Sequence, residues 1–305
     1  MIKKSKKFKR RRKIVAIMFI IILCSLVYTR YAYSYKMEVK AKENHVLQVR
    51  AQTVLEKSKE EKAASAAIEL RAKVANAANT YDIQKISDIA KGKGVKDGKK
   101  IAFLTFDDGP STTVTPKVLD ILKNNNIKAT FFTLGNAIES NNSSKELIKR
   151  IAKEGHALGN HGYSHDMKII YPHNKLDVNV FMAEIEKTNN ILESILGQDF
   201  NARAIRMPGG YMSRVYYHDP KLTELNAKLK EKDLYSIDWN AYVFDAEGKK
   251  KTSPELVEAF KENVGKQEKI VVLMHDTYGK ESTAKALPEI IDYLKTSGYE
   301  FKIIK

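Results

Sequence analysis

Residues 101–110 read IAFLTFDDGP, an apolar run that ends abruptly in two aspartates, a glycine and a proline. The apolar part has the length and composition of a buried β-strand, and Gly109-Pro110 turns the chain at its end. Asp and Gly favour turns, so the aspartates could form no more than a polar turn. Paired carboxylates after a buried strand are equally typical of an acid/base or metal site. The rest of the chain has to decide between the two.

Strand and helix patterns alternate from this stretch to the C-terminus. The alternation predicts βαβ units and a mostly parallel sheet, and therefore the α/β class. The predicted strands are residues 101–106, 130–134, 157–160, 204–207, 234–239, 269–274 and 299–304, and the predicted helices are residues 115–124, 144–154, 180–196, 221–231, 254–264 and 283–296.

Polar side chains stand at the carboxyl ends of five predicted strands. In parallel α/β folds the chemistry gathers at this edge of the sheet. Core packing alone would not place polar residues there, so the sequence predicts one functional site. Its candidate residues are Asp107, Asp108, His161, Arg206, Asp238 and His275.

A further histidine, His165, follows His161 by four residues, which would place both rings on one side of a helical turn. Such a pair ligates zinc well, although a histidine pair alone is a weak signal. One carboxylate oxygen added to the pair would give a metal three protein ligands and leave a position for water. Cys24 is the single cysteine, which excludes a cysteine-rich metal site and an internal disulfide.

Five segments in order resemble the motifs of the polysaccharide deacetylases, carbohydrate esterase family 4. The resemblance covers residues 99–305 and implies a distorted (β/α) barrel with about seven parallel strands. It also implies a metal-dependent hydrolase that deacetylates polysaccharides. The segments are Thr105-Phe106-Asp107-Asp108-Gly109-Pro110, His161 with His165, Arg206-Met207-Pro208-Gly209-Gly210, Asp238-Trp239, and Leu273-Met274-His275-Asp276.

The resemblance implies a metal centre and a base beside it. Asp108, His161 and His165 would bind one divalent metal ion, with zinc the expected metal. Asp107 would be the general base that takes a proton from water. Arg206 would pair with Asp107 and fix its geometry.

An acid and a substrate-binding wall are implied in the same way. His275 would be the general acid that protonates the leaving amine, and Asp238 would hold its imidazole. The backbone N–H of Gly209 would meet the oxyanion. Taken alone, Trp239 and Leu273 are equally typical of a core, and Tyr211 of an exposed loop. The expected substrate-binding residues are Gly209, Trp239 and Leu273, with Tyr211 as a candidate for sugar stacking.

The net charge of +16 lies in the N-terminal third of the chain. Residues 1–13 hold nine Lys and Arg and no acidic residue, whereas residues 101–305 hold 28 basic and 28 acidic residues. A neutral C-terminal region argues against a basic nucleic-acid-binding domain there.

The apolar residues 14–28 follow the basic run directly, which is the pattern of a secretion signal or membrane anchor. No good small-x-small cleavage site ends them, and the tyrosines at 28, 31, 33 and 35 suit a membrane interface. We expect an uncleaved signal anchor that crosses the cell membrane once, with the C-terminal region extracellular. Secretion after cleavage is the alternative. The expected parts are residues 1–35 as basic cytoplasmic tail and anchor, 36–98 as helical stalk or linker, and 99–305 as catalytic domain.

The expected function is removal of N-acetyl groups from a cell-envelope polysaccharide, with the N-acetylglucosamine of peptidoglycan as leading substrate. Rival substrates are a secondary wall polymer, an exopolysaccharide, chitooligosaccharides and acetylxylan. A non-catalytic glycan-binding module is the rival from another class, and the presence of base, metal ligands and acid argues against it. The expected partners are wall glycan and the membrane, with no nucleic acid and a monomeric catalytic domain.

Overall fold

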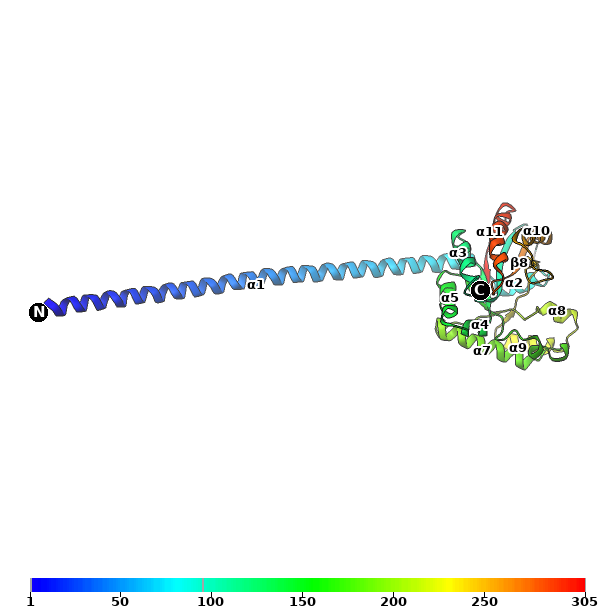
Figure 1. Ribbon diagram of the computed structural model, residues 1–305, viewed down its shortest axis with the longest axis horizontal. Coiled ribbons are helices and arrows are strands. Elements are labelled where there is room, and N and C mark those ends of the chain that lie inside the picture. The colour runs from blue at the N-terminus through cyan, green and yellow to red at the C-terminus, as the bar shows by residue number, and fades with distance from the viewer. Residues whose placement is uncertain (1, 95, 305) are drawn as a thin grey trace. The chain divides into compact units, whose positions relative to one another are not determined.

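A computed structural model describes residues 2–94 and 96–304 of the chain (Figure 1). Within the first helix, side chains are described for residues 18–59 and 62. The chain divides into two compact units, and the division falls between Arg71 and Ala72.

Helix α1 (Ile2–Asn79) supplies the N-terminal unit. Large apolar side chains from Met18 to Tyr28 are exposed along it, with Phe19 69% and Val27 64% exposed. Among the described residues, α1 is the one helix that is long and apolar enough to cross a membrane. The side chains of residues 14–17, where the expected anchor begins, lie outside the described ones. A bilayer would cover an apolar surface of this kind.

The second unit is built on a parallel sheet with the order β6-β5-β4-β3-β2-β8-β7, and β9 also pairs with β2. Every described pairing in this sheet is parallel, so the predicted α/β class with about seven parallel strands is confirmed. The strands are β2 (Ile101–Gly109), β3 (Thr130–Thr133), β4 (Ala157–Asn160), β5 (Ala204–Ile205), β6 (Tyr235–Ser236), β7 (Ala241–Tyr242), β8 (Lys269–His275) and β9 (Glu300–Phe301).

Amphipathic helices pack side by side around the sheet in the order α10, α11, α3, α5 and α7 (Figure 1). Each buries apolar residues three or four apart; α11, for example, buries Leu287, Ile290, Ile291 and Leu294. The helices are α3 (Thr115–Asn124), α4 (Gly135–Glu139), α5 (Asn142–Lys153), α6 (Met167–Ile170), α7 (Val178–Leu196), α8 (Tyr211–Tyr216), α9 (Leu222–Glu231), α10 (Ser253–Val264) and α11 (Glu281–Thr296), with a short 3-10 turn at Pro172–Asn174.

The N-terminal boundary of this unit differs from the prediction. After α1, β1 (Thr80–Tyr81) pairs with β10 (Ile303–Ile304), and α2 (Ile83–Ala90) packs into the core. The predicted stalk of residues 36–98 therefore extends too far. Its apolar stripe, Ile83, Ile86 and Ile89, is confined to one eight-residue helix and was hidden by polar neighbours.

Helix α2 covers the inner face of the sheet. Side chains alternate along a strand, so Leu104 and Phe106 of β2 join the core under α3 and α11, whereas Phe103 joins the core with α2. Thr105 and Asp107 have the same parity as Phe103. The strand therefore directs Asp107 to the inner face, at the carboxyl edge of the sheet.

Candidate active site

A bulge at the end of β2 brings two carboxylates to one pocket. Alternation along the strand would send Asp107 and Asp108 to opposite faces. The pairing register with β3 shifts between Asp107 and Gly109, and Asp108 has a φ of 68°. Bulges re-aim side chains in this way, and both aspartates line the same pocket. A positive φ is uncommon outside glycine, and such strain clusters at functional sites.

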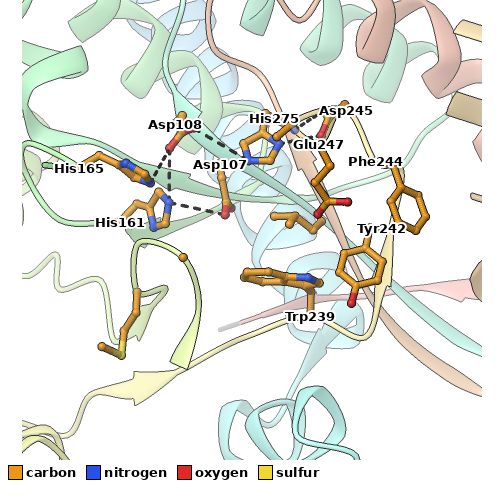
Figure 2. Close-up of a pocket in the computed structure, with 14 residues that line it drawn as sticks. Asp107, Asp108, His161, His165, Trp239, Tyr242, Phe244, Asp245, Glu247 and His275 are labelled. Atoms are coloured by element: carbon orange, nitrogen blue, oxygen red, sulfur yellow. Dashed lines mark hydrogen bonds and ion pairs between the residues drawn. The ribbon is translucent and has the colours of Figure 1, made fainter. Parts of the chain in front are cut away.

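Asp108 forms a three-residue cluster with the two histidines (Figure 2). Its Oδ1 lies 3.4 Å from Nε2 of His161 and 3.8 Å from Nε2 of His165. The three ligand atoms lie within 4.8 Å of one another. Asp108 Oδ1 is buried without a hydrogen-bond partner, which is costly unless a cation satisfies it. One carboxylate and two imidazoles form a donor set that suits a divalent metal such as zinc.

The loop after β4 carries both histidines, and the backbone after β5 holds the ring of His161. His161 Nδ1 lies 2.7 Å from the carbonyl oxygen of Arg206, so its Nδ1–H donates there and Nε2 stays free as a ligand. The predicted helical turn over residues 161–165 is wrong. These residues form an irregular loop, and His165 has a φ of 56°.

Glu184 of α7 fixes the shape of that loop. Its Oε2 accepts the backbone N–H groups of Tyr163 and Ser164, each at 3.2 Å, and its Oε1 accepts the Ser164 hydroxyl. Asn160 Oδ1 accepts the N–H of Gly162 at 2.9 Å. Side-chain acceptors on α7 and β4 therefore replace the helical hydrogen bonds that the spacing suggested.

Arg206 pairs with Asp107 on the inner face of the sheet. Its Nη1 lies 2.7 Å from Asp107 Oδ1, and its side chain is completely buried. The guanidinium also donates to the Thr105 hydroxyl at 2.7 Å, to the carbonyl of Ile237 at 2.9 Å and to that of Asp238 at 3.1 Å. A buried charge is tolerated when it is paired and hydrogen-bonded in this way. Asp107 is thereby held with Oδ2 at 3.7 Å from His161 Nε2, beside the Asp108–His161–His165 cluster.

Asp245, rather than Asp238, holds His275. The Nδ1 of His275 lies 2.8 Å from Asp245 Oδ1, and the His275 backbone N–H donates to Asp245 Oδ2 at 2.9 Å. Thr283 donates its hydroxyl to the same oxygen at 2.8 Å. Lys280 Nζ donates to the Asp245 carbonyl at 2.7 Å. The second nitrogen of His275, Nε2, is left for chemistry and lies 4.0 Å from Asp108 Oδ2 (Figure 2).

Asp238 has a different task. Its Oδ1 accepts the N–H of Tyr211 at 2.8 Å, and its Oδ2 accepts the N–H of Met212 at 2.6 Å. Both carboxylate oxygens thus bind the first N–H groups of α8, where a negative charge is favourable. The predicted contact of Asp238 with His275 is wrong because its carboxylate is already used to fix α8 after the Pro208-Gly209-Gly210 turn.

Three of the four expected wall residues line the pocket. Gly209, Trp239 and Leu273 line it together with the Asp108–His161–His165 cluster and His275. Tyr211 does not. It is only 9% exposed, its hydroxyl accepts a hydrogen bond from Asn226 at 2.9 Å, and Lys91 Nζ lies 4.8 Å from its ring centre. The turn of α8 imposed by Asp238 points this ring toward α9, so Tyr211 belongs to the core.

Burial and neighbouring charges shift the pKa values of two groups in opposite directions. Burial alone would lower the pKa of His275, but the hydrogen bond and charge of Asp245, with the charges of Asp107 and Asp108, raise it above its ordinary value. Burial alone would raise the pKa of Asp108, but the adjacent His161 and the charges of His165 and His275 lower it far below its ordinary value. Asp108 is therefore ionised, as a metal ligand would have to be, and His275 is biased toward its protonated form.

Comparison with known proteins shows which family has this fold. The family model described as polysaccharide deacetylase matches residues 94–227. A peptidoglycan-N-acetylglucosamine deacetylase of Bacillus cereus is 32% identical over 216 residues, which cover 68% of this chain and 87% of that relative. The chain belongs to the polysaccharide deacetylase family. The motif resemblance is confirmed, and the chain is a hydrolase of this class.

Two further comparisons show the extent of the likeness. Another peptidoglycan-N-acetylglucosamine deacetylase of Bacillus cereus is 35% identical over 65% of this chain, and the match spans 64% of that relative's length. The solved structure of a Streptococcus mutans CE4 esterase is 32% identical and superposes with a TM-score of 0.67, covering 75% of this chain and 93% of that one. The half-barrel fold belongs to the shared part.

Sequence reasoning missed two residues of this deacetylase site. Asp245 follows the two-residue strand β7, which is too short to be recognised from its composition. The motif resemblance also points to Asp238, seven residues earlier, instead of to Asp245. Glu184 lies in the middle of a long amphipathic helix, where nothing distinguishes it from a solvated acid.

Proposed function

We propose that this deacetylase removes N-acetyl groups from a cell-envelope glycan, with N-acetylglucosamine residues of peptidoglycan as its substrate. One observation carries the proposal. Three separately held groups meet in a single pocket: the Asp108–His161–His165 cluster, Asp107 held by Arg206, and His275 held by Asp245. Amide hydrolysis needs an activated water, a base and an acid, and these three groups match those three needs.

A bound divalent ion, for which we propose zinc, would lower the pKa of water and polarise the acetyl carbonyl. Asp107 takes one proton from the attacking water as the new C–O bond forms. Arg206 holds Asp107 at the angle at which its free oxygen faces the cluster. His275 donates its Nε2 proton to the amide nitrogen as the C–N bond breaks, so the products are acetate and a glucosamine amine. Asp245 keeps the imidazole oriented during this transfer.

The N–H of Gly209 is proposed to stabilise the negative oxygen of the tetrahedral intermediate. Gly209 lines the pocket, and no described residue accepts a hydrogen bond from its N–H. An N–H that is fixed and free can serve a charge that exists only in the transition state. Trp239 and Leu273 then close the space around the acetyl methyl group.

Peptidoglycan is proposed as the glycan because relatives that share a third of the residues carry that substrate in their names. The exposed apolar segment of α1 supports an N-terminal anchor, or a signal peptide, that would direct the catalytic unit to the outer face of the membrane. We place the C-terminal end of the stalk at Asn79, where α1 ends, instead of at residue 98.

The test is acetate release by the full-length chain in detergent, with purified peptidoglycan, chitooligosaccharides and acetylxylan as substrates. We expect acetate and a matching number of free amines from peptidoglycan. Treatment with a chelator should abolish release, and added zinc should restore it. Retained glycan binding without acetate from any substrate would instead support a non-catalytic glycan-binding module. Preference for acetylxylan would indicate that the substrate is an O-acetylated glycan.

A further inference from the structure

The peptide proposed to supply the oxyanion N–H lies in a tight turn. The N–H of Gly210 donates to the carbonyl of Met207 at 2.8 Å, and Gly209 has a φ of 74°. A proline at the second position of the turn, Pro208, and a glycine with positive φ at the third, Gly209, define a type II turn. Type I and type II turns differ by a half-rotation of their central peptide, here Pro208–Gly209. The orientation of this one peptide decides which side its N–H faces.

A buried hydroxyl sets that orientation. Tyr171 is 5% exposed, and its Oη donates to the carbonyl oxygen of Pro208 at 2.9 Å. A trans peptide is planar, so its C=O and N–H point to opposite sides. A donor fixed on the carbonyl side therefore directs the Gly209 N–H away from Tyr171. Gly209 meets the catalytic pocket, and no described residue accepts its N–H.

Tyr171 is itself held firmly. The guanidinium of Arg214 lies over its ring, 4.4 Å from the centroid, and Arg214 Nη1 donates to the backbone and side-chain oxygens of Asn174 at 3.2 and 3.1 Å. Burial raises the pKa of Tyr171, so the hydroxyl keeps its proton and remains a donor. The ring cannot easily turn away from Pro208, and the turn cannot flip without losing this bond.

We infer that Tyr171 is a positioning residue that selects the type II form of the Met207–Gly210 turn and so aims the Gly209 N–H at the oxyanion. This inference rests on the proposed function of Gly209. Tyr171 touches neither substrate nor metal in this scheme. It acts through the peptide, so it should affect the rate of the chemical step more than the binding of glycan or metal.

The experiment compares Tyr171→Phe with wild type in the full-length, zinc-loaded chain. Removing the hydroxyl alone should lower kcat about 10- to 100-fold, below the full loss of an oxyanion donor. KM and bound zinc should stay within about twofold, since neither depends on this peptide. Tyr299→Phe is the matched control, because Tyr299 is also buried and donates its hydroxyl to a backbone carbonyl, that of Gln267, far along the chain. Its kcat should not change.

A second readout does not depend on turnover. In the ¹⁵N-glycine-labelled chain, added acetate should shift the Gly209 amide resonance of wild type and Tyr299→Phe but not that of Tyr171→Phe. Unchanged kcat and an unchanged acetate shift in Tyr171→Phe would overturn the inference, as would an equal loss in Tyr299→Phe. No acetate release by wild type would instead remove the proposed function, while the amide shift would still report on Tyr171.

A separate observation concerns the aromatic wall beyond Trp239. The ring of Tyr242 lies 6.3 Å from Trp239 and 5.1 Å from Phe244, between centroids, and all three line the pocket with Glu247 (Figure 2). Phe244 has a φ of 58°, a true outlier for a bulky residue. Strain of this kind persists only where the surroundings impose it, and it clusters at binding sites.

Two lysines hold the loop that carries this wall. Lys251 Nζ donates to the carbonyls of Phe244 at 3.0 Å and Glu247 at 2.7 Å, and Lys280 Nζ donates to that of Asp245. The Glu247 carboxylate has no hydrogen-bond or ion-pair partner among the described residues, although it lines the pocket. The loop is thus built rigidly while its polar group is left unused.

We propose that Tyr242 and Phe244 stack on a sugar ring next to the residue being deacetylated, and that Glu247 accepts a hydrogen bond from a hydroxyl of that glycan. The subsite deepens the proposed function and would make a glycan chain a better substrate than a single acetyl group. Aromatic faces offer a large apolar area at low entropy cost, which suits the C–H face of a pyranose.

Phe244→Asn tests the subsite without disturbing the fold, because Asn tolerates a left-handed backbone. We expect kcat/KM for an N-acetylglucosamine tetrasaccharide to fall about tenfold more than kcat/KM for 4-nitrophenyl acetate. The melting temperature should hold or rise. His218→Asn is the matched control, since His218 is exposed and has a φ of 51°. His218→Asn should change the melting temperature in the same direction as Phe244→Asn, without the selective loss of kcat/KM for the tetrasaccharide.

An equal fall for both substrates, or no fall for either, would overturn the proposed subsite. If wild type hydrolysed the ester but no tetrasaccharide, the glycan assignment itself would fail, and the binding of the tetrasaccharide to both variants would then decide on the subsite.

Discussion

Asp238 and Asp245 stand seven residues apart, and both side chains are buried at the carboxyl edge of the sheet, yet they serve different partners. Asp238 gives both oxygens to backbone N–H groups at the start of α8. Asp245 gives one oxygen to the imidazole of His275 and the other to a backbone N–H and a hydroxyl. The pKa of Asp238 is raised, chiefly by burial, whereas that of Asp245 is lowered because His275 and Thr283 outweigh its burial. A carboxylate at a strand end thus marks the site without showing which partner it has.

The largest difference should follow Asp245→Asn. Loss of a partner of this kind typically costs about 10- to 100-fold in activity. Because the carboxylate raises the pKa of His275, its removal lowers that pKa, and the acid loses its proton at lower pH. The alkaline limb of the pH–kcat profile should therefore move to lower pH. The measurement is kcat across the pH range for wild type and Asp245→Asn. An alkaline limb that does not move would show that Asp245 does not set the pKa of the catalytic acid.

Asp238→Asn should mainly change stability. An amide oxygen can accept one of the two α8 N–H bonds but not both, so we expect a loss of about 1 kcal/mol in the free energy of unfolding. Urea unfolding measures this loss. The alkaline limb of kcat should stay in place, because Asp238 does not touch His275. A shift of the limb as large as that of Asp245→Asn would show that the comparison is wrong.

The smallest effect is expected from Thr283→Val, which removes one hydrogen bond to Asp245 and keeps the shape of the side chain. One such bond is worth about 1 kcal/mol, so kcat should fall about threefold to fivefold, with a small shift of the same alkaline limb. Steady-state kinetics at several pH values would detect it. A change in KM without a change in kcat would place Thr283 in substrate binding instead.

Much of the fold could be predicted, because long apolar runs and amphipathic periods mark β2, β8 and the larger helices. The predicted helix 115–124 has the bounds of α3, and the predicted strand 269–274 is β8 without its last residue. Strands of two residues, such as β7, bury too little to leave a pattern. Helix α2 was not predicted either, because its packing against Phe103 and Phe132 depends on contacts distant in sequence.

The grouping of Asp108 with His161 and His165, and the Asp107–Arg206 pair, could be predicted because these motif residues lie directly beside each other. Asp245, Glu184 and Tyr171 could not, since each acts on another residue through a hydrogen bond that depends on tertiary structure. The backbone at Asp108 and His165 is the clearest case. Its left-handed conformation aims the side chains, and the residue types alone do not encode it.

The central claim is that neighbouring aspartates have separate tasks, with Asp108 as metal ligand and Asp107 as base. Asp107→Asn and Asp108→Asn, measured side by side for bound zinc and acetate release, test it most directly. We predict that Asp107→Asn keeps one zinc per chain and loses activity by about 100-fold or more. Asp108→Asn should lose both zinc and activity. Loss of zinc from Asp107→Asn, or full acetate release by it, would contradict the account.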